Sequence, residues 1–375
     1  MPAAKSKKFV IPAFRRAQRP GSFSGSLVFL LLLLSTNLFS QSLNFRNYSG
    51  EEILPSSTVY ASFQDSKGYI WFATDHGVSR YDGYGFTQLS LKEGLADHEV
   101  FNFFEDSRGR IWFHTANGRV CYFKNGLMVS SVNDTKLAGL DSESYITGMC
   151  EDPQGNIWIA TIRSGIIKYD EKKGVVRRYN LDDEDGKLIY ALLWVGERLL
   201  VVTERNAITF RTGDEEIDVE KRKTIWPDIP AWGYPKCIDL QNGRVLISDY
   251  IAIIQYDLLT DEITTIQDSV STYNLTQDQD HAWFCTITGA LQYSKKQQKI
   301  TGQILKDHKI SSVLKDSEGN HWFTSLGDGI FYSTSPEVLS FTAKDGLPGK
   351  VNCLAKDAQN RIWIGYKEKN AISYV

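Results

Sequence analysis

Carboxylate and imidazole side chains recur at short turns between apolar runs, and they could support two kinds of chemistry. Asp75, Asp249 and Asp328 carry carboxylates, and His76 carries an imidazole. Glycoside hydrolysis requires two carboxylates that face one another across a cleft, whereas a lyase requires a positioned base such as histidine. The sequence does not show that these groups converge. We therefore predict no catalytic residue and keep an exported enzyme of glycosidase or lyase type as an alternative.

The cysteines do not indicate a metal centre or a defined disulfide. The chain has five, at Cys121, Cys150, Cys237, Cys285 and Cys353. They form no CxxC pair and no histidine cluster accompanies them, so we predict no metal site and no cofactor. Three of them lie in apolar runs, where a thiol serves as a small hydrophobic side chain. We therefore expect buried free thiols.

One motif dominates the chain: Asp, two residues, Gly, two residues, Trp, and then a short apolar run that usually ends in Thr. The copies contain Asp65, Gly68 and Trp71; Asp106, Gly109 and Trp112; Asp152, Gly155 and Trp158; Trp283 in a shorter copy; Asp316, Gly319 and Trp322; and Asp357 and Trp363. Two worn units have Leu199 and Leu246 at the tryptophan position. The spacing is 37 to 47 residues. A period near 40 restricts the fold to propeller blades or paired-helix solenoids.

The local pattern decides between these two folds. The first unit contains four short β-rich runs, at residues 59–63, 70–74, 77–82 and 85–89, separated by Asp- and Gly-containing turns. Four strands joined by tight turns form a β-meander, and radial repetition of such sheets forms a propeller. The sequence therefore predicts an all-β propeller of four-stranded antiparallel blades.

The motif residues have expected structural roles. The Asp65 carboxylate can accept hydrogen bonds from backbone N–H groups of its turn. Gly68 can supply the positive φ that closes the turn, and Trp71 can fill the space between adjacent blades. The competing interpretation is that these aspartates are catalytic or bind metal. A site that is used once does not need eight copies.

An antiparallel meander with strands A to D places the A–B and C–D turns on one face of the ring. The B–C turns and the D-to-A connections lie on the other face, which we call the varied face because its residues differ between units. Variation on a fixed scaffold is typical of recognition, and such polar residues suit a multi-hydroxyl ligand such as an oligosaccharide. The alternative is that they are ordinary solvated turns. The candidate ligand-binding residues are Asp75, His76, Asn117, Arg163, Arg205, Asp249, Tyr250 and Asp328.

The number of blades remains open between seven and eight, and we favour seven. Residues 45–49 resemble a D strand that precedes the first A strand, and such a strand can complete the last blade of a propeller. We assign blades 1–7 to residues 42–340. The eighth unit, residues 341–375, is either a closing blade or the truncated start of a second propeller.

The N-terminus is typical of an export signal. Six basic residues and no acidic ones lie within residues 1–40, and an apolar core of eight residues, 27–34, precedes a small polar stretch. This order indicates a signal peptide at residues 1–41, the alternative being an uncleaved membrane anchor. Residues 41–375 carry 36 basic and 45 acidic side chains, a net charge of −9. Nucleic-acid binding needs a basic surface, so we expect none.

Residues 65–83 and 93–113 resemble two-component regulator propeller repeats. These repeats occur in the exported sensor regions of large bacterial sensor histidine kinases, especially of the Bacteroidetes type. The resemblance implies a longer parent protein with an immunoglobulin-like module, a membrane helix and a cytoplasmic kinase. It also implies anchoring in the inner membrane through that downstream helix, and it leaves homodimerisation of the full-length receptor open. Residues 1–375 contain no kinase segment, so we predict no enzymatic activity for this chain.

Our leading hypothesis is therefore a periplasmic propeller that senses an extracytoplasmic ligand for a histidine kinase. The alternatives are the exported enzyme and a protein-interaction platform. Carboxylates gathered in the central channel would favour the enzyme, and a flat apolar varied face without a pocket would favour the platform.

Overall fold

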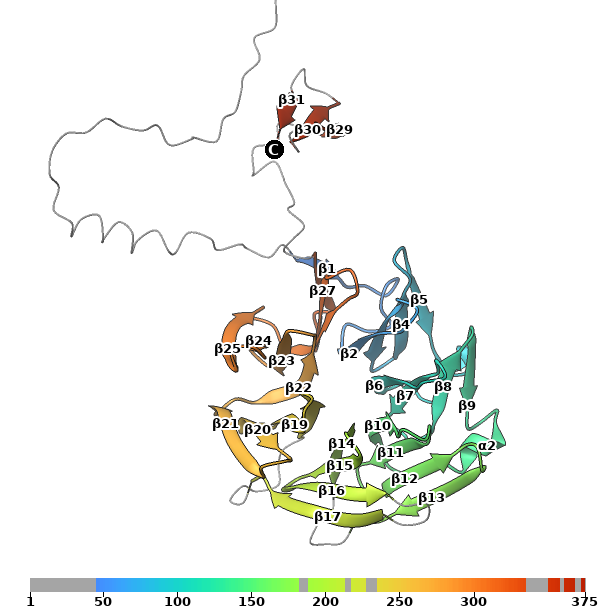
Figure 1. The fold of residues 1–375 in the computed structure, drawn as a ribbon. Coiled ribbons are helices and arrows are strands. Elements are labelled where there is room, and N and C mark those ends of the chain that lie inside the picture. The colour runs from blue at the N-terminus through green and yellow to red at the C-terminus, as the bar shows by residue number, and fades with distance from the viewer. Residues whose placement is uncertain are drawn as a thin grey trace, which may run out of the picture. The chain divides into compact units, whose positions relative to one another are not determined.

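The computed structural model describes residues 45–181, 188–212, 217–226, 235–334, 350–357, 361–367 and 372–374. From residue 45 to residue 334 the strands form seven four-stranded antiparallel sheets, arranged in a ring (Figure 1). Two short helical segments, η2 (Leu91–Glu93) and α2 (Thr135–Ala138), accompany the described strands. The predicted all-β propeller with seven blades is confirmed.

The first four blades follow the chain in order. Their strands are β2 (Val59–Gln64), β3 (Ile70–Thr74), β4 (Gly77–Tyr81) and β5 (Phe86–Leu89); β6 (Val100–Glu105), β7 (Ile111–Thr115), β8 (Cys121–Lys124) and β9 (Leu127–Ser130); β10 (Ile146–Glu151), β11 (Ile157–Thr161), β12 (Gly165–Asp170) and β13 (Val175–Tyr179); and β14 (Ile189–Val195), β15 (Arg198–Thr203), β16 (Asn206–Thr212) and β17 (Ile217–Thr224).

The remaining three blades follow in chain order, and the last of them takes its fourth strand from the N-terminal end of the propeller. Their strands are β18 (Lys236–Asp239), β19 (Arg244–Ser248), β20 (Ala252–Asp257) and β21 (Glu262–Asp268); β22 (Thr272–Gln277), β23 (His281–Thr286), β24 (Gly289–Ser294) and β25 (Lys299–Ile304); and β26 (Ile310–Lys315), β27 (His321–Ser325), β28 (Ile330–Ser333) and β1 (Arg46–Tyr48).

The ring closes by pairing its two ends. Strand β1 runs antiparallel to β28, with Tyr48 opposite Ile330, so it takes the D position of blade 7. Gly329 before β28 has φ 74°, and an added Cβ would clash with the Tyr48 carbonyl oxygen. In blade 1 a Cβ on Gly77 would lie 2.7 Å from the carbonyl oxygen of the true D strand, at Leu89. The same close contact between the C and D strands occurs in both blades, so β1 takes the place of a D strand. Blade 7 is therefore complete, and the ring closes without an eighth unit.

Tyr48 is the main side-chain anchor of this closure. It is 9% exposed, its ring stacks on Trp322 with centroids 5.9 Å apart, and Phe86 of blade 1 lies 5.4 Å away. We expect Tyr48→Ala to lower the free energy of unfolding by about 2–3 kcal/mol, because it empties an aromatic site between two blades. Urea unfolding would measure this. Tyr84→Ala, at a 99% exposed ring, is the control, and equal losses in the two variants would contradict the role of Tyr48.

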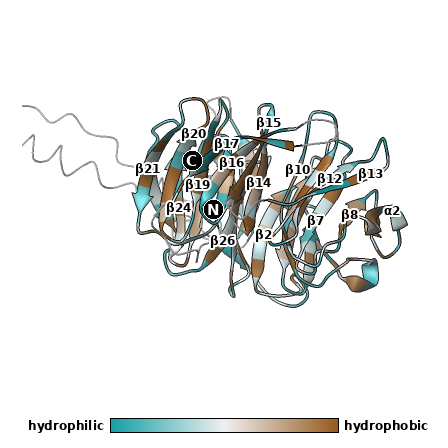
Figure 2. Ribbon diagram, turned by 90° about the horizontal axis from the view of Figure 1, so that it is seen from below, coloured by the Kyte–Doolittle hydropathy of each residue, from teal (hydrophilic) through white to brown (hydrophobic). Residues whose placement is uncertain are grey.

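Hydrophobic side chains pack between neighbouring blades, and hydrophobic residues follow the strands in Figure 2. Trp71 is fully buried and packs against Phe113 of blade 2 at 6.0 Å between ring centroids. In blade 4 the predicted tryptophan position, Leu199, is wrong by one residue, and Leu200 occupies it. Leu199 packs with Trp158 on the side of blade 3, whereas Leu200 faces blade 5. The cause is a shorter A–B turn, since Val195 pairs directly with Arg198.

The remaining described residues, 350–357, 361–367 and 372–374, belong to a second unit. Within that part, β29 (Val351–Lys356), β30 (Ile362–Tyr366) and β31 (Ile372–Tyr374) form a three-stranded antiparallel sheet. The predicted signal peptide and the predicted boundary at residue 340 lie outside the described residues. Within the described ranges, no helix has the length and apolar character needed to cross a membrane.

Candidate functional site

The repeated aspartates are fully engaged in their own turns. Asp65 Oδ1 accepts hydrogen bonds from the backbone N–H groups of Lys67 and Tyr69, at 3.0 and 2.9 Å. Asp65 Oδ2 accepts one from the Trp71 indole at 2.8 Å. The equivalent indole bond recurs at Asp106, Asp152, Asp278, Asp316 and Asp357, at 2.8–3.0 Å. The carboxylate therefore fixes the turn and orients the inter-blade tryptophan, a bond that we did not predict.

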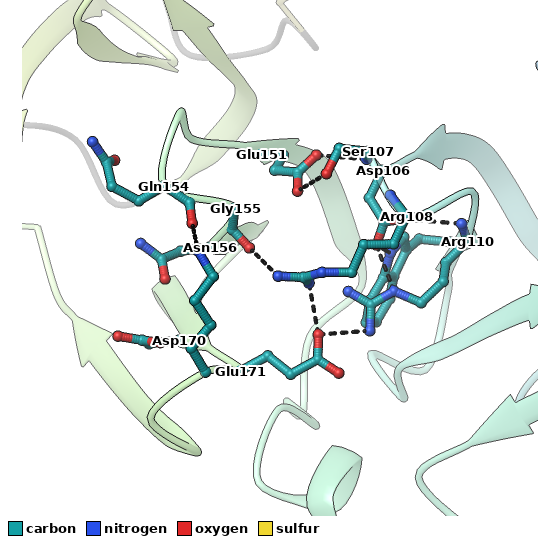
Figure 3. A network of polar contacts seen from close by, with 12 residues as sticks. Asp106, Ser107, Arg108, Arg110, Glu151, Gln154, Gly155, Asn156, Asp170 and Glu171 are labelled. Atoms are coloured by element: carbon teal, nitrogen blue, oxygen red, sulfur yellow. Dashed lines mark hydrogen bonds and ion pairs between the residues drawn. The ribbon is translucent and has the colours of Figure 1, made fainter.

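A second repeated contact ties neighbouring blades together (Figure 3). Glu151 of blade 3 accepts hydrogen bonds from the backbone N–H and the hydroxyl of Ser107 in blade 2, at 2.6 and 2.7 Å. Glu105 binds Ser66 in the same way. Across the ring closure, Gln64 Oε1 accepts from the Ser317 N–H at 2.8 Å. The face with the A–B turns is therefore largely scaffold.

The varied face does not bring the eight candidate residues together. Arg163 and Arg205 are exposed, His76 pairs with its neighbour Asp75 at 3.1 Å, and Asp328 Oδ2 lies 2.9 Å from His308 Nδ1.

Two other candidates have local structural contacts. The Asn117 side-chain amide donates to the Ala96 carbonyl at 2.9 Å, and buried Asp249 accepts from the Tyr250 N–H at 2.6 Å. Only Tyr250 lines the cavity described next.

A cavity of about 490 Å³ lies where the inner strands begin, at the end of the central channel that belongs to the varied face. Six of the seven blades contribute to its wall, mostly through the first residues of their A strands. The lining residues are Tyr60, Phe101, Asn102, His114, Tyr145, Ile146, Thr147, Lys236, Tyr250, Tyr273, Asn274, Ser311 and Leu326. None of these described lining residues carries a carboxylate, so the wall does not present the pair that glycoside hydrolysis requires.

Aromatic rings form two parts of this wall. Phe101 lies 5.2 Å from Tyr60 and 5.7 Å from Tyr145, measured between ring centroids. Tyr250 and Tyr273 form a second pair at 6.4 Å. The Tyr60 hydroxyl donates to Glu99 Oε1 at 2.7 Å. Burial, together with this hydrogen bond, raises the pKa of Tyr60. The rings offer flat apolar surfaces on which a ligand ring can stack.

Two polar atoms of the cavity are buried without a hydrogen-bond partner. His114 is 5% exposed and its Nε2 has no hydrogen-bond partner, and neither does Thr147 Oγ1. Burial, aided by the nearby charge of Lys236, lowers the pKa of His114 to about 3. Burial also lowers the pKa of Lys236. The neutral imidazole of His114 and the half-buried side chain of Lys236 thus line the same cavity.

Most cavity residues were not predicted, because they lie on the inner strands, whereas the predicted candidates lie in turns. Two signals were available. An aromatic residue stands second in four inner strands, at Tyr60, Phe101, Tyr190 and Tyr273. His114 stands next to the terminal Thr, at the position where blades 1 and 3 carry Ala73 and Ala160.

The cysteines are free in the described residues. Three are buried, Cys237 is half-buried and Cys353 is exposed. The expectation of buried thiols is therefore wrong for Cys353, which lies in the separate three-stranded sheet. Within the described residues, no cluster of three metal-ligating side chains occurs.

Three segments of the chain, residues 53–76, 94–117 and 139–163, match the family model described as two component regulator propeller. A search of curated proteins found no match. The resemblance to this repeat family is confirmed by these segments.

Solved structures share the fold at low sequence identity. The extracellular domain of the putative hybrid two component system BT3049 from B. thetaiotaomicron has a TM-score of 0.62 at 17% identity, over 89% of this chain and 48% of that one. The corresponding domain of BT4673 gives 0.63 at 17%, over 86% and 45%. This chain thus spans about half of each of these extracellular domains.

An enzyme of similar fold is also found. A catalytically inactive variant of virginiamycin B lyase from Staphylococcus aureus, with quinupristin, has a TM-score of 0.61 at 18% identity, over 78% of this chain and 99% of that one. At these identities the likeness concerns the fold alone.

Proposed function

We propose that this chain, which carries two-component regulator propeller repeats, is the ligand-sensing input module of a sensor histidine kinase. One observation carries the proposal: six blades converge on a cavity that holds desolvated polar groups without partners. Burying a polar group without a hydrogen bond costs stability. A ligand that satisfies such groups recovers that cost, so these groups mark a binding site and not a folding device.

The remaining parts of the proposal concern a longer protein. The structural neighbours are extracellular domains of hybrid two-component systems, which supports an exported, periplasmic propeller. The bound state would bias a two-state arrangement of the receptor, transmitted through a downstream membrane helix to a kinase. Homodimerisation of the receptor belongs to the same proposal, and the expected ligand is a multi-hydroxyl compound such as an oligosaccharide.

A thermal-shift screen of the purified chain against oligosaccharides and small metabolites tests the proposal. We expect at least one compound to raise Tm, since a ligand at 100 times its Kd adds about 2.7 kcal/mol of stability. Phe101→Ala, which removes a central ring of the wall, should abolish the shift, whereas Tyr84→Ala should keep it. The absence of any binder while the fold is intact would count against ligand sensing.

The alternative of an exported lyase has one observation in its favour, which is the imidazole of His114 in the cavity. A general base works best when its pKa lies near the working pH. A pKa of about 3 makes His114 a weak base at neutral pH. The cavity also departs from the flat apolar face that an interaction platform would present, so ligand sensing is the better supported function.

A further inference from the structure

Lys236 is the only charged residue among the described residues that line the cavity, with His114 neutral at pH 7. It opens β18, and in the described part of the chain it forms no ion pair. Lys236 is half-buried, and taking an ammonium group even partly out of water is costly unless an anion accompanies it. A lysine retained here without a counter-ion indicates that the anion arrives with the ligand.

The groups around Lys236 further restrict the chemical class of the ligand. His114 Nε2 and Thr147 Oγ1 are buried without partners, so the ligand must also offer hydroxyl groups or similar hydrogen-bonding groups. The two aromatic clusters of the wall suit flat or ring-shaped bodies. The exported part of the chain carries a net charge of −9, so its overall field repels anions. Attraction of an anion must therefore come from this local cation.

We propose that the cavity binds an acidic oligosaccharide, whose carboxylate or sulfate pairs with Lys236 while its hydroxyl groups reach His114 and Thr147. This inference rests on the proposed ligand sensing and specifies the ligand of the same site. Phe101 and the Tyr250–Tyr273 pair stack on sugar rings. Carboxylate and sulfate present the same charge to Lys236, and separate arms of the experiment distinguish them.

Isothermal titration of the purified chain provides the test. The probes are uronic-acid trisaccharides, each paired with its carboxyl-reduced neutral counterpart, and a sulfated galactose trisaccharide. We expect an acidic probe to bind and its neutral counterpart to bind at least tenfold more weakly. Lys236→Met should weaken binding of the acidic probe about 10- to 100-fold, the range for a hydrogen bond to a charged group. Lys236→Arg should preserve the preference for acid.

Lys299→Met is the matched control, because Lys299 is exposed on the outer strand β25, and it should leave binding unchanged. Equal binding of acidic and neutral sugars, or an acid preference that survives Lys236→Met, would overturn the inference. If the acidic probes fail while another compound binds in the cavity, the anion inference is wrong and ligand sensing stands. If nothing binds, both are wrong.

A measurement without ligand separates recognition from a structural role. Lys236→Met removes a half-buried charge that has no ion-pair partner among the described residues, so Tm should stay the same or rise at pH 7. A lower Tm than that of the Lys299→Met variant would mean that Lys236 supports the fold, and would contradict its assignment to the ligand.

Discussion

Replacing Asp106 by alanine should lower the free energy of unfolding by about 3–5 kcal/mol, the cost of breaking a buried ion pair. The Asp106 side chain is fully buried, and Arg110 Nε lies 2.5 Å from Oδ2. The Trp112 indole donates to the same oxygen at 2.9 Å. Oδ1 accepts from the backbone N–H groups of Arg108 and Arg110, both at 3.0 Å. Alanine would leave an indole N–H and two amides without this acceptor, and the buried Arg110 guanidinium would keep only Glu171, 3.0 Å from its Nη1, as an ionic partner.

Urea unfolding, followed by tryptophan fluorescence, would measure this loss. Asp106→Asn retains an acceptor but not the charge, so it should fall between the wild type and Asp106→Ala. Asp82→Ala is the control, because Asp82 also accepts two backbone N–H groups, of Tyr84 and Gly85, but is exposed. If Asp106→Ala costs no more than Asp82→Ala, the repeated aspartate is not the clamp that we describe.

This clamp explains why the fold could be predicted from the sequence. Asp65, Gly68 and Trp71 act within seven residues, so the turn and the inter-blade tryptophan are both encoded locally. Each further copy repeats the same local geometry. Closure is different, because it depends on pairing between Arg46–Tyr48 and the distant β28. The eighth unit carries the same motif around Asp357, so repeat counting alone could not separate seven blades from eight.

The cavity could be predicted only in part, for a related reason. Strand alternation correctly located a face with B–C turns and D-to-A connections, and Tyr250 lies in one of those turns. Leu326 lies in another of these turns, and most of the remaining lining residues come together only because ring closure brings six inner strands around one axis. Lys236 and His114 lie 122 positions apart in the sequence and in different blades, so nothing local indicates that they share a hollow.

His114 should make the protein increasingly sensitive to acid between about pH 6.5 and pH 3. Burial holds its pKa at about 3 in the folded state, whereas an unfolded histidine has a pKa of about 6.5. Below pH 6.5, His114 binds a proton in the unfolded chain but stays neutral in the folded protein. The free energy of unfolding therefore falls as the pH falls. The slope from this residue is about 1.4 kcal/mol per pH unit, and the total approaches about 4 kcal/mol near pH 3.

His114→Ala, which restores the residue found at Ala73 and Ala160, removes this proton uptake and provides the measurement. Urea unfolding of both proteins from pH 3.5 to 8 should give curves that run parallel above pH 7.5 and separate in favour of the variant as the pH falls. Parallel curves throughout would mean that the folded protein protonates His114 readily. A ligand that excludes water and forms a hydrogen bond with His114 Nε2 should change the pH dependence of the free energy of unfolding. A ligand that binds outside the cavity should not change it. The pH dependence of stability therefore also reports where a ligand binds.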